Sequence, residues 1–249
     1  LLKEHIWVDS IKVKDKKFLK DIDLVVDLSS HSTNPPYHSY DECIYWNVYQ
    51  KSIFVNDAIN AGITNFIFFG SCFEYGHSAN NYKFIPENAS LKPLNSYSLS
   101  KAMFTQYLET FSILNPKIKI TLFRLFHVYG NGELKSRLWP SLKKAAESGK
   151  NFEISSGEQI RDFIEVTELC EMITLYIKKY FIENYPSDKI SNFNTYNLAS
   201  GKALSVKDFC LRWWKEMNAK GSLKIGKLAY RKNELMRVVA DTTNIKKLF

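Results

Sequence analysis

Tyr97 and Lys101 are the two residues whose types and spacing point most directly to chemistry. They stand four positions apart in a run that reads as a helix, which puts both side chains on one face, about 5–6 Å apart. A neighbouring ammonium lowers the pKa of a phenol by stabilising the phenolate. Such a pair can move a proton to or from the oxygen of an alcohol or a ketone. The same spacing also occurs in helices that have no catalytic role, so the surrounding sequence must show whether this pair is catalytic.

A third candidate, Ser71, follows an apolar run over residues 65–70. That run has the length of a buried parallel strand, and a Gly-Ser turn ends it. In open α/β sheets, ligands bind beyond the carboxyl ends of the strands. The Ser71 hydroxyl is therefore placed to hydrogen-bond a substrate oxygen beside Tyr97, although a serine at a strand end also serves as an ordinary turn residue.

The elements that must position these residues alternate along the chain. Strands are expected at 24–28, 65–70, 118–125, 163–166 and 195–198, and helices at 47–61, 97–114 and 139–146. Strands separated by helices of this length indicate βαβ units and a parallel sheet. After Gly130 the alternation breaks, and the sequence contains no internal repeat.

Composition restricts the class of protein. The chain has 249 residues, of which 45% are hydrophobic and 24% charged, enough for a substantial core. It contains no apolar stretch approaching 18 residues and no signal-peptide pattern. The four cysteines are scattered without metal-ligand spacing. We therefore expect a cytoplasmic globular protein with reduced thiols, no membrane segment and no metal site.

The net charge of +8 favours anionic partners. The lysines are dispersed along the chain, so a phosphate-bearing small substrate explains the charge as well as nucleic acid does. We expect the former, and no nucleic-acid partner.

Five motifs stand in a fixed order. They are DLVVDLSS at 23–30, SCFEYG at 71–76, YSLSK at 97–101, FRLFHVYG at 123–130 and RDFIEV at 161–166, the last followed by YNLASG at 196–201. This ordered set resembles the extended short-chain dehydrogenase/reductase family, which contains nucleotide-sugar epimerases, dehydratases and ketoreductases. The resemblance implies an α/β fold with a Rossmann-type, doubly wound parallel sheet and a small C-terminal substrate lobe.

The resemblance also implies roles for individual residues. Tyr97 would be the catalytic acid/base, Lys101 would hold the nicotinamide ribose, and Ser71 would bind the reacting sugar oxygen. The residues assigned to an NAD or NADP site are Leu28, Ser29, Ser30, Tyr97, Lys101 and Leu125. Those assigned to a nucleotide-diphosphate sugar are Ser71, His127, Arg161 and Arg231.

One departure concerns the start of the chain. The family opens with a strand and a glycine-rich turn on which the pyrophosphate rests. Neither is present here, and the first motif corresponds to the family's fourth strand. We interpret this as roughly 50–60 residues missing before Leu1, given about 30 residues per βαβ unit. The expected division is a dinucleotide-binding domain at 1–130 and 158–200 and a substrate lobe at 131–157 and 201–249.

The positions after Ser71 bear on the reaction. Dehydratases of this family carry an Asp-Glu pair there for the elimination, whereas this chain has Cys72 and Phe73. The sequence therefore looks most like the 4-keto-6-deoxysugar reductases that serve surface polysaccharide synthesis. Two alternatives remain open: a 4-epimerase with a retained NAD, and a Rossmann-like binding protein without catalysis.

The resemblance further implies a homodimer formed through two long helices. The helix expected at 97–114 carries Phe104, Leu108 and Phe111 at helical spacing. This stripe fits either a subunit interface or the subunit's own core.

Overall fold

The computed structural model describes residues 19–183 and 191–249, which form two compact units. Among the described residues, unit 1 contains 19–76, 90–124, 176–183 and 191–196, and unit 2 contains 77–89, 125–175 and 197–249. The domain boundaries expected from the sequence stay a prediction.

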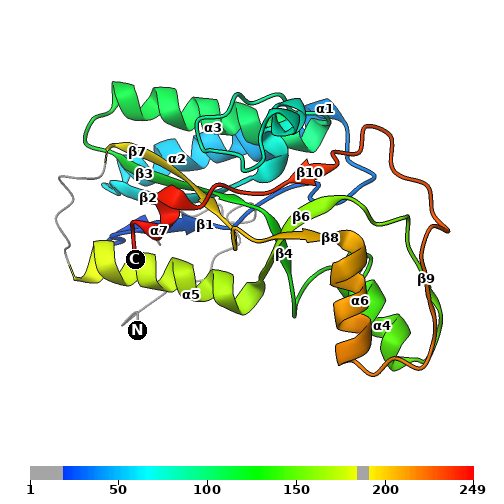
Figure 1. The fold of residues 1–249 in the computed structure, drawn as a ribbon. Helices are drawn as coiled ribbons and strands as arrows, with labels where there is room; N and C mark the ends of the chain where they lie inside the picture. Colours follow the sequence, from blue (N-terminus) through cyan, green and yellow to red (C-terminus); the bar gives the residue numbers. More distant parts are fainter. Residues whose placement is uncertain (1–18, 184–190) are drawn as a thin grey trace. The chain divides into compact units, whose positions relative to one another are not determined.

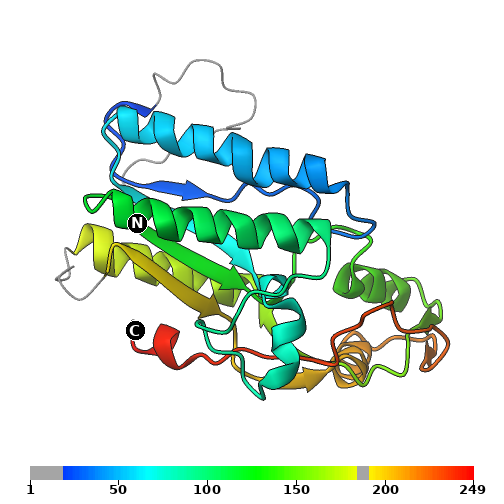
Figure 2. The ribbon, with the colours of Figure 1, turned by 90° about the horizontal axis from the view of Figure 1, so that it is seen from above.

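Unit 1 is built on a four-stranded sheet in the order β1-β2-β3-β7. Its strands are β1 (Val25–Asp27), β2 (Asn65–Ser71), β3 (Lys119–Leu125) and β7 (Phe193–Leu198). β1 runs parallel to β2, with Val25 opposite Phe66. Helices α2 (Gln50–Asn60) and α3 (Ser96–Leu114) lie on one face of this sheet (Figures 1 and 2). The predicted α/β class with a Rossmann-type parallel sheet is confirmed.

The core of unit 1 lies between this sheet face and the two helices. It includes the buried side chains Val55, Ala58, Ile63, Phe66, Phe68, Phe104, Leu108, Ile120 and Leu122. Phe104 and Leu108 are almost fully buried, and Phe111 packs against the same cluster. The apolar stripe of α3 thus belongs to the subunit's own core, because these positions face β2 and β3.

The helix expected at 47–61 begins earlier than the sequence suggested. It starts as α1 (Tyr40–Ile44), continues as a π-helical segment (Tyr45–Tyr49) and ends as α2. Ser39 caps it, because its hydroxyl accepts a hydrogen bond from the N–H of Glu42 while the Glu42 carboxylate accepts from the N–H of Ser39. This Ser-x-x-Glu capping box was the sequence signal for the earlier start.

Unit 2 contains a second sheet in the order β10-β6-β4. Its strands are β4 (His127–Tyr129), β6 (Ile160–Glu165) and β10 (Arg237–Val238), with β8 (Ala203–Ser205) antiparallel to β6. Strands β5 (Phe152–Glu153) and β9 (Leu223–Lys224) form a separate parallel pair. The helices are α4 (Leu138–Glu147), α5 (Val166–Ile177), α6 (Val206–Glu216) and α7 (Thr243–Lys246).

Aromatic packing holds α6 to β6 in unit 2. The rings of Phe163 and Phe209 stack with centroids 3.9 Å apart, and Tyr129 meets Phe209 edge-on at 5.0 Å. Trp139 of α4 and Trp213 of α6 approach each other at 5.8 Å. Offset and edge-to-face ring pairs of this kind add stability beyond the apolar area that they bury.

Two further observations bear on the class of protein. All four cysteines are free thiols, three of them buried. Within 19–183 and 191–249, no helix combines the length and the apolar character that crossing a membrane requires.

Candidate functional site

Ser71 ends β2 and caps the short 3-10 helix Cys72–Glu74. Its Oγ accepts a hydrogen bond from the N–H of Phe73 at 3.2 Å, and its own N–H donates to Glu74 Oε1 at 2.7 Å. A Cβ on Gly70 would lie 2.4 Å from Glu74 Oε1, so the preceding position requires glycine. The Gly-Ser turn predicted from the sequence therefore fixes the backbone on both sides of the Ser71 hydroxyl.

The Glu74 carboxylate holds this turn in place. It is fully buried, and its Oε2 accepts hydrogen bonds from Arg124 Nε and Thr105 Oγ1, both at 2.9 Å. Arg124 also donates to the Tyr75 hydroxyl at 3.1 Å. This role of Glu74 was not predicted from the sequence, although the Ser-x-x-Glu spacing from Ser71 is typical of a capping box.

Tyr97 lies in the first turn of α3 and is 8% exposed. Asn95 begins that helix by accepting a hydrogen bond from the N–H of Ser98 at 2.9 Å. The Tyr97 hydroxyl forms hydrogen bonds with Ser71 and Ser30. The structure therefore brings together three of the predicted site residues, Ser30, Ser71 and Tyr97.

Burial raises the pKa of the Tyr97 phenol to about 12, while the hydrogen bonds with Ser71 and Ser30 act in the opposite direction. The pKa shift is thus upward, opposite to the direction expected from a neighbouring lysine. Desolvation disfavours the phenolate more than these neighbours stabilise it. At neutral pH Tyr97 is protonated, and it can act as a proton donor.

Lys101 lies one turn further along α3 and is buried. Its Nζ donates a hydrogen bond to the carbonyl oxygen of Phe69, at 2.6 Å. Burial lowers its pKa, against the opposing charges of Glu74 and Asp27. The ammonium is therefore held at the end of β2.

A pocket lies beyond the carboxyl end of β1. Its lining consists of Asp27, Ser29, Ser30, His31, Trp46, Asn47, Gln50, Lys51 and Phe54. Lys51 Nζ pairs with Asp27 Oδ2 at 2.8 Å and donates to the Ser29 carbonyl at 2.6 Å. Burial lowers the pKa of Lys51 to about 8, and Lys101 adds to this while Asp27 opposes it.

These residues fit a dinucleotide along the strand end. The pocket offers hydroxyls, an amide and a buried cation, which are groups suited to ribose and phosphate oxygens. Of the other residues assigned to the cofactor, Leu28 is largely exposed after β1, and Leu125 is the half-buried last residue of β3.

Two further residues of unit 1, Tyr37 and Asn47, support Tyr97, and the family resemblance had already pointed to the second of them. The ring of Tyr37 stacks on that of Tyr97, with centroids 5.8 Å apart and planes 9° from parallel. Asn47 donates to the hydroxyl of Ser100 at 2.9 Å, and Ser100 donates to the Tyr97 carbonyl at 2.8 Å. Asn47 also bonds both the N–H and the carbonyl of His31. No sequence pattern pointed to Tyr37.

In unit 2, Arg161 and His127 lie on neighbouring strands β6 and β4. Arg161 is buried and forms an ion pair with Glu234. Burial lowers the pKa of His127 well below its ordinary value, and the charges of Arg161 and Arg137 add to the effect. Arg231 is exposed, and its carbonyl accepts a hydrogen bond from the N–H of Glu234 at 3.2 Å. Three of the residues predicted to bind substrate, His127, Arg161 and Arg231, thus lie in unit 2. Glu234 contacts both Arg161 and Arg231.

Comparison with known sequences gives a family match over most of the chain. Residues 9–191 match the profile described as "NAD dependent epimerase/dehydratase family". A curated relative, the dTDP-6-deoxy-L-talose 4-dehydrogenase (NAD(+)) of Aggregatibacter actinomycetemcomitans, is 23% identical over 77% of this chain and 66% of its own length. The CDP-abequose synthase of Salmonella typhimurium is 25% identical over 66% of this chain and 53% of its own length.

A solved structure shares the fold. The UDP-N-acetylglucosamine 4-epimerase from Methanobrevibacter ruminantium M1 aligns with a TM-score of 0.82 over 98% of this chain and 75% of its own, at 22% identity. At that identity the likeness shows the fold alone. The chain spans between about half and two thirds of the length of the curated relatives it matches.

Proposed function

Because the chain belongs to the NAD dependent epimerase/dehydratase family, we propose that it is part of a nucleotide-sugar ketoreductase. The substrate would be a nucleotide-linked keto-deoxyhexose, and the reductant NADH or NADPH. The observation that carries this proposal is the Tyr97 phenol, which is protonated at neutral pH and hydrogen-bonded to Ser71 at a strand end. A ketone that accepts hydride needs such a proton donor.

The chain's own residues would act as follows. The reduced nicotinamide supplies the hydride for the keto carbon when it is bound. Ser71 donates a hydrogen bond to the keto oxygen and orients it. Tyr97 transfers its proton to the same oxygen as negative charge develops there, which leaves a phenolate. The Lys101 ammonium, four residues along the helix, favours that phenolate electrostatically.

The residues that follow Ser71 argue against a dehydratase. Cys72 and Phe73 occupy the positions of the elimination pair in the family's dehydratases, and neither side chain is a comparable acid or base. Glu74 is the nearest carboxylate in sequence. It is committed to Arg124, Thr105 and the N–H of Ser71.

We assign substrate binding to the residues of unit 2. Arg161 would grip the diphosphate, because a planar guanidinium can bond two phosphate oxygens at once. For this it would exchange its carboxylate partner Glu234 for phosphate. Arg231 and His127 would complete the nucleotide-sugar contacts.

We also propose a homodimer, but not through the α3 stripe that is buried. Tyr45 is 45% exposed, Tyr49 55% and Ile53 36%, and they follow one another along the π-helical segment and α2. An exposed apolar row of this kind is typical of an interface. A mass of one subunit by light scattering of the full-length protein at micromolar concentration would refute the dimer.

The reductase and the epimerase differ in how they hold the dinucleotide. A reductase exchanges oxidised for reduced cofactor at each turnover, so we expect full-length protein to purify largely free of nicotinamide. It should oxidise added NADH or NADPH only when a nucleotide-linked keto-deoxyhexose is present. Stoichiometric tightly bound NAD, with interconversion of unreduced nucleotide hexoses, would make the protein a 4-epimerase. No reaction and no cofactor binding would leave a binding protein without catalysis.

A further inference from the structure

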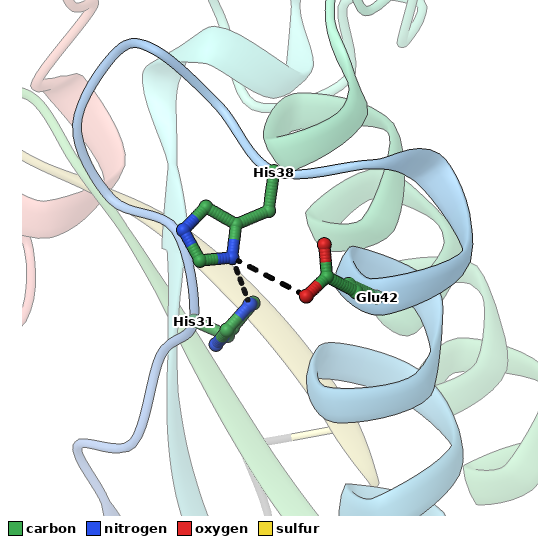
Figure 3. A group of neighbouring side chains, drawn as sticks. All are labelled: His31, His38 and Glu42. Carbon is green, nitrogen blue, oxygen red and sulfur yellow. Dashed lines mark hydrogen bonds and ion pairs between the residues drawn. The ribbon is translucent and has the colours of Figure 1, made fainter.

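Two histidines and a carboxylate converge on the segment after β1. Figure 3 shows His31 and His38 with their rings turned toward each other and Glu42 reaching in from α1. His31 Nε2 and His38 Nδ1 share a hydrogen bond of 3.0 Å, and His38 Nδ1 lies 3.7 Å from Glu42 Oε1. The candidate donor atoms of the three residues all lie within 4.8 Å of one another.

These separations approach those of a zinc site. With bonds of 2.0–2.1 Å, two ligand atoms of a tetrahedral zinc ion stand about 3.3 Å apart. The two measured neighbour distances lie on either side of that value. Two imidazoles with one carboxylate are also a common three-ligand set of zinc sites that keep an open position. His38 and Glu42 are exposed and His31 is half-buried, so rotation of the two exposed side chains would bring the three atoms around one ion.

The backbone under the cluster is already fixed. His31 is held at its N–H and its carbonyl by Asn47, at 2.8 and 3.1 Å. The N–H of His38 donates to Ser32 Oγ at 2.8 Å, and its carbonyl accepts from Ser96 Oγ at 2.6 Å. The main chain that carries the two histidines is therefore in place before a metal arrives, and only side-chain rotation is left to bring the ligands together.

The Glu42 carboxylate divides its two oxygens between two tasks. Oε2 accepts hydrogen bonds from the N–H and hydroxyl of Ser39 in the capping box, which leaves Oε1 on the side of His38. A carboxylate ligand that is oriented by a hydrogen bond from a neighbouring hydroxyl is a recurrent feature of metal sites.

We propose that His31, His38 and Glu42 form a zinc site of the His2Glu type. Cys43 lies beside the cluster, with its thiol 3.8 Å from the His38 carbonyl oxygen, but it is not one of the three candidate ligands. The site was not predicted from the sequence, from which no metal was expected. Bound zinc would cross-link the segment after β1 to the first turn of α1. That segment also carries Tyr37, which stacks on Tyr97, so the metal would fix a neighbour of the proposed proton donor.

The test is calorimetric titration of metal-free full-length protein with Zn²⁺. We expect saturable binding of one ion per chain at this cluster. Glu42→Gln and His38→Asn should each weaken it by roughly tenfold or more, since each removes a ligand. His77→Ala is the matched control, because His77 is an exposed histidine outside the cluster, and it should leave the affinity unchanged. None of these readouts depends on the proposed reductase activity.

Two further measurements keep the test decisive. Circular dichroism of each metal-free variant checks folding, and the conservative Glu42→Gln carries the test if His38→Asn does not fold. Co²⁺ in place of Zn²⁺ should give a visible spectrum without the charge-transfer bands of thiolate ligation. Absence of saturable binding, an affinity that both variants leave unchanged, or a thiolate spectrum would overturn the proposal.

Discussion

The surroundings of Tyr97 in unit 1 and those of Arg161 in unit 2 are built in contrasting ways. Around Tyr97, the charges of Glu74, Lys51 and Lys101 are each fully or nearly buried, and each is held by at least one hydrogen bond or ion pair. Around Arg161, the pairing residue Glu234 is 20% exposed and lies next to the exposed Arg231. We therefore expect the region around Tyr97 to stay fixed and Arg161 to be able to exchange its partner.

This difference matches the two tasks that the proposed ketoreductase would perform. Proton transfer needs donor and acceptor held within a fraction of an ångström, which a buried network provides. Binding a charged substrate instead needs a cation that can leave its resting partner. We therefore expect changes in unit 1 to affect turnover and stability, and changes around Arg161 to affect substrate affinity.

The largest effect should come from Tyr97→Phe, which removes the transferable proton and leaves the ring. The turnover number should fall by roughly 10²–10⁴-fold, the usual contribution of general acid catalysis. Steady-state kinetics of NAD(P)H oxidation measures this. Tyr107→Phe, a half-buried tyrosine of the same helix that packs against Phe104 and Phe111, is the control and should keep near-normal turnover. A Tyr97→Phe enzyme with normal turnover would remove Tyr97 from the chemistry.

Glu74→Gln should be the most destabilising change in the same region. It leaves the buried Arg124 guanidinium without its charged partner, and removing one member of a buried pair costs about 3–5 kcal/mol. Urea denaturation followed by circular dichroism gives the free energy of unfolding. Glu216→Gln breaks the exposed Arg212–Glu216 pair on α6 and should cost about 0.5 kcal/mol or less. Equal losses for the two variants would contradict the contrast between buried and exposed pairs.

Arg161→Ala tests the exchangeable region. The Michaelis constant for the nucleotide sugar should rise by roughly ten- to a hundredfold, since charge-assisted hydrogen bonds contribute about 1.5–3 kcal/mol, while turnover should change less. Glu234→Gln frees the guanidinium instead of removing it and should not raise the Michaelis constant. A rise of the same size in both variants would mean that the ion pair matters only for the fold of this region.

The smallest effect concerns pH and Lys51. Its pKa in the folded chain is about 8, below the ordinary 10.5, so the unfolded chain binds more protons between these two pH values. The free energy of unfolding should therefore gain a rising contribution from about pH 8 to about pH 10.5. Lys51→Met should abolish that contribution, whereas the exposed control Lys202→Met should retain it. Denaturation curves at several pH values compare the slopes, and identical slopes in all three proteins would contradict the pKa.

The sequence predicted the parallel sheet, the helix carrying Tyr97 and the strand end at Ser71, because apolar periodicity and turn residues are local signals. The sequence did not predict the hydrogen bonds and ion pairs that connect the site residues. The partners of Glu74 come from α3 and β3, 31 and 50 residues further on, and no local pattern specifies such contacts. The predicted direction of the Tyr97 pKa shift was wrong for the same reason. Burial, which raises this pKa, arises from the packing of the whole unit. The π-helical turn that contains Asn47 could not be predicted either, because an apolar pattern with a period of 3.6 residues indicates only a regular α-helix.

The most direct test of the central claim, a hydride transfer completed by Tyr97, is to trace the hydride. Full-length protein would be incubated with NADH or NADPH carrying deuterium at the transferable position and with a nucleotide-linked 4-keto-6-deoxyhexose, and the products analysed by mass spectrometry. We predict one deuterium on the former keto carbon for each cofactor oxidised, and almost none over the same time with Tyr97→Phe. Turnover of a nucleotide sugar without cofactor oxidation, or undiminished deuterium transfer by Tyr97→Phe, would contradict the account.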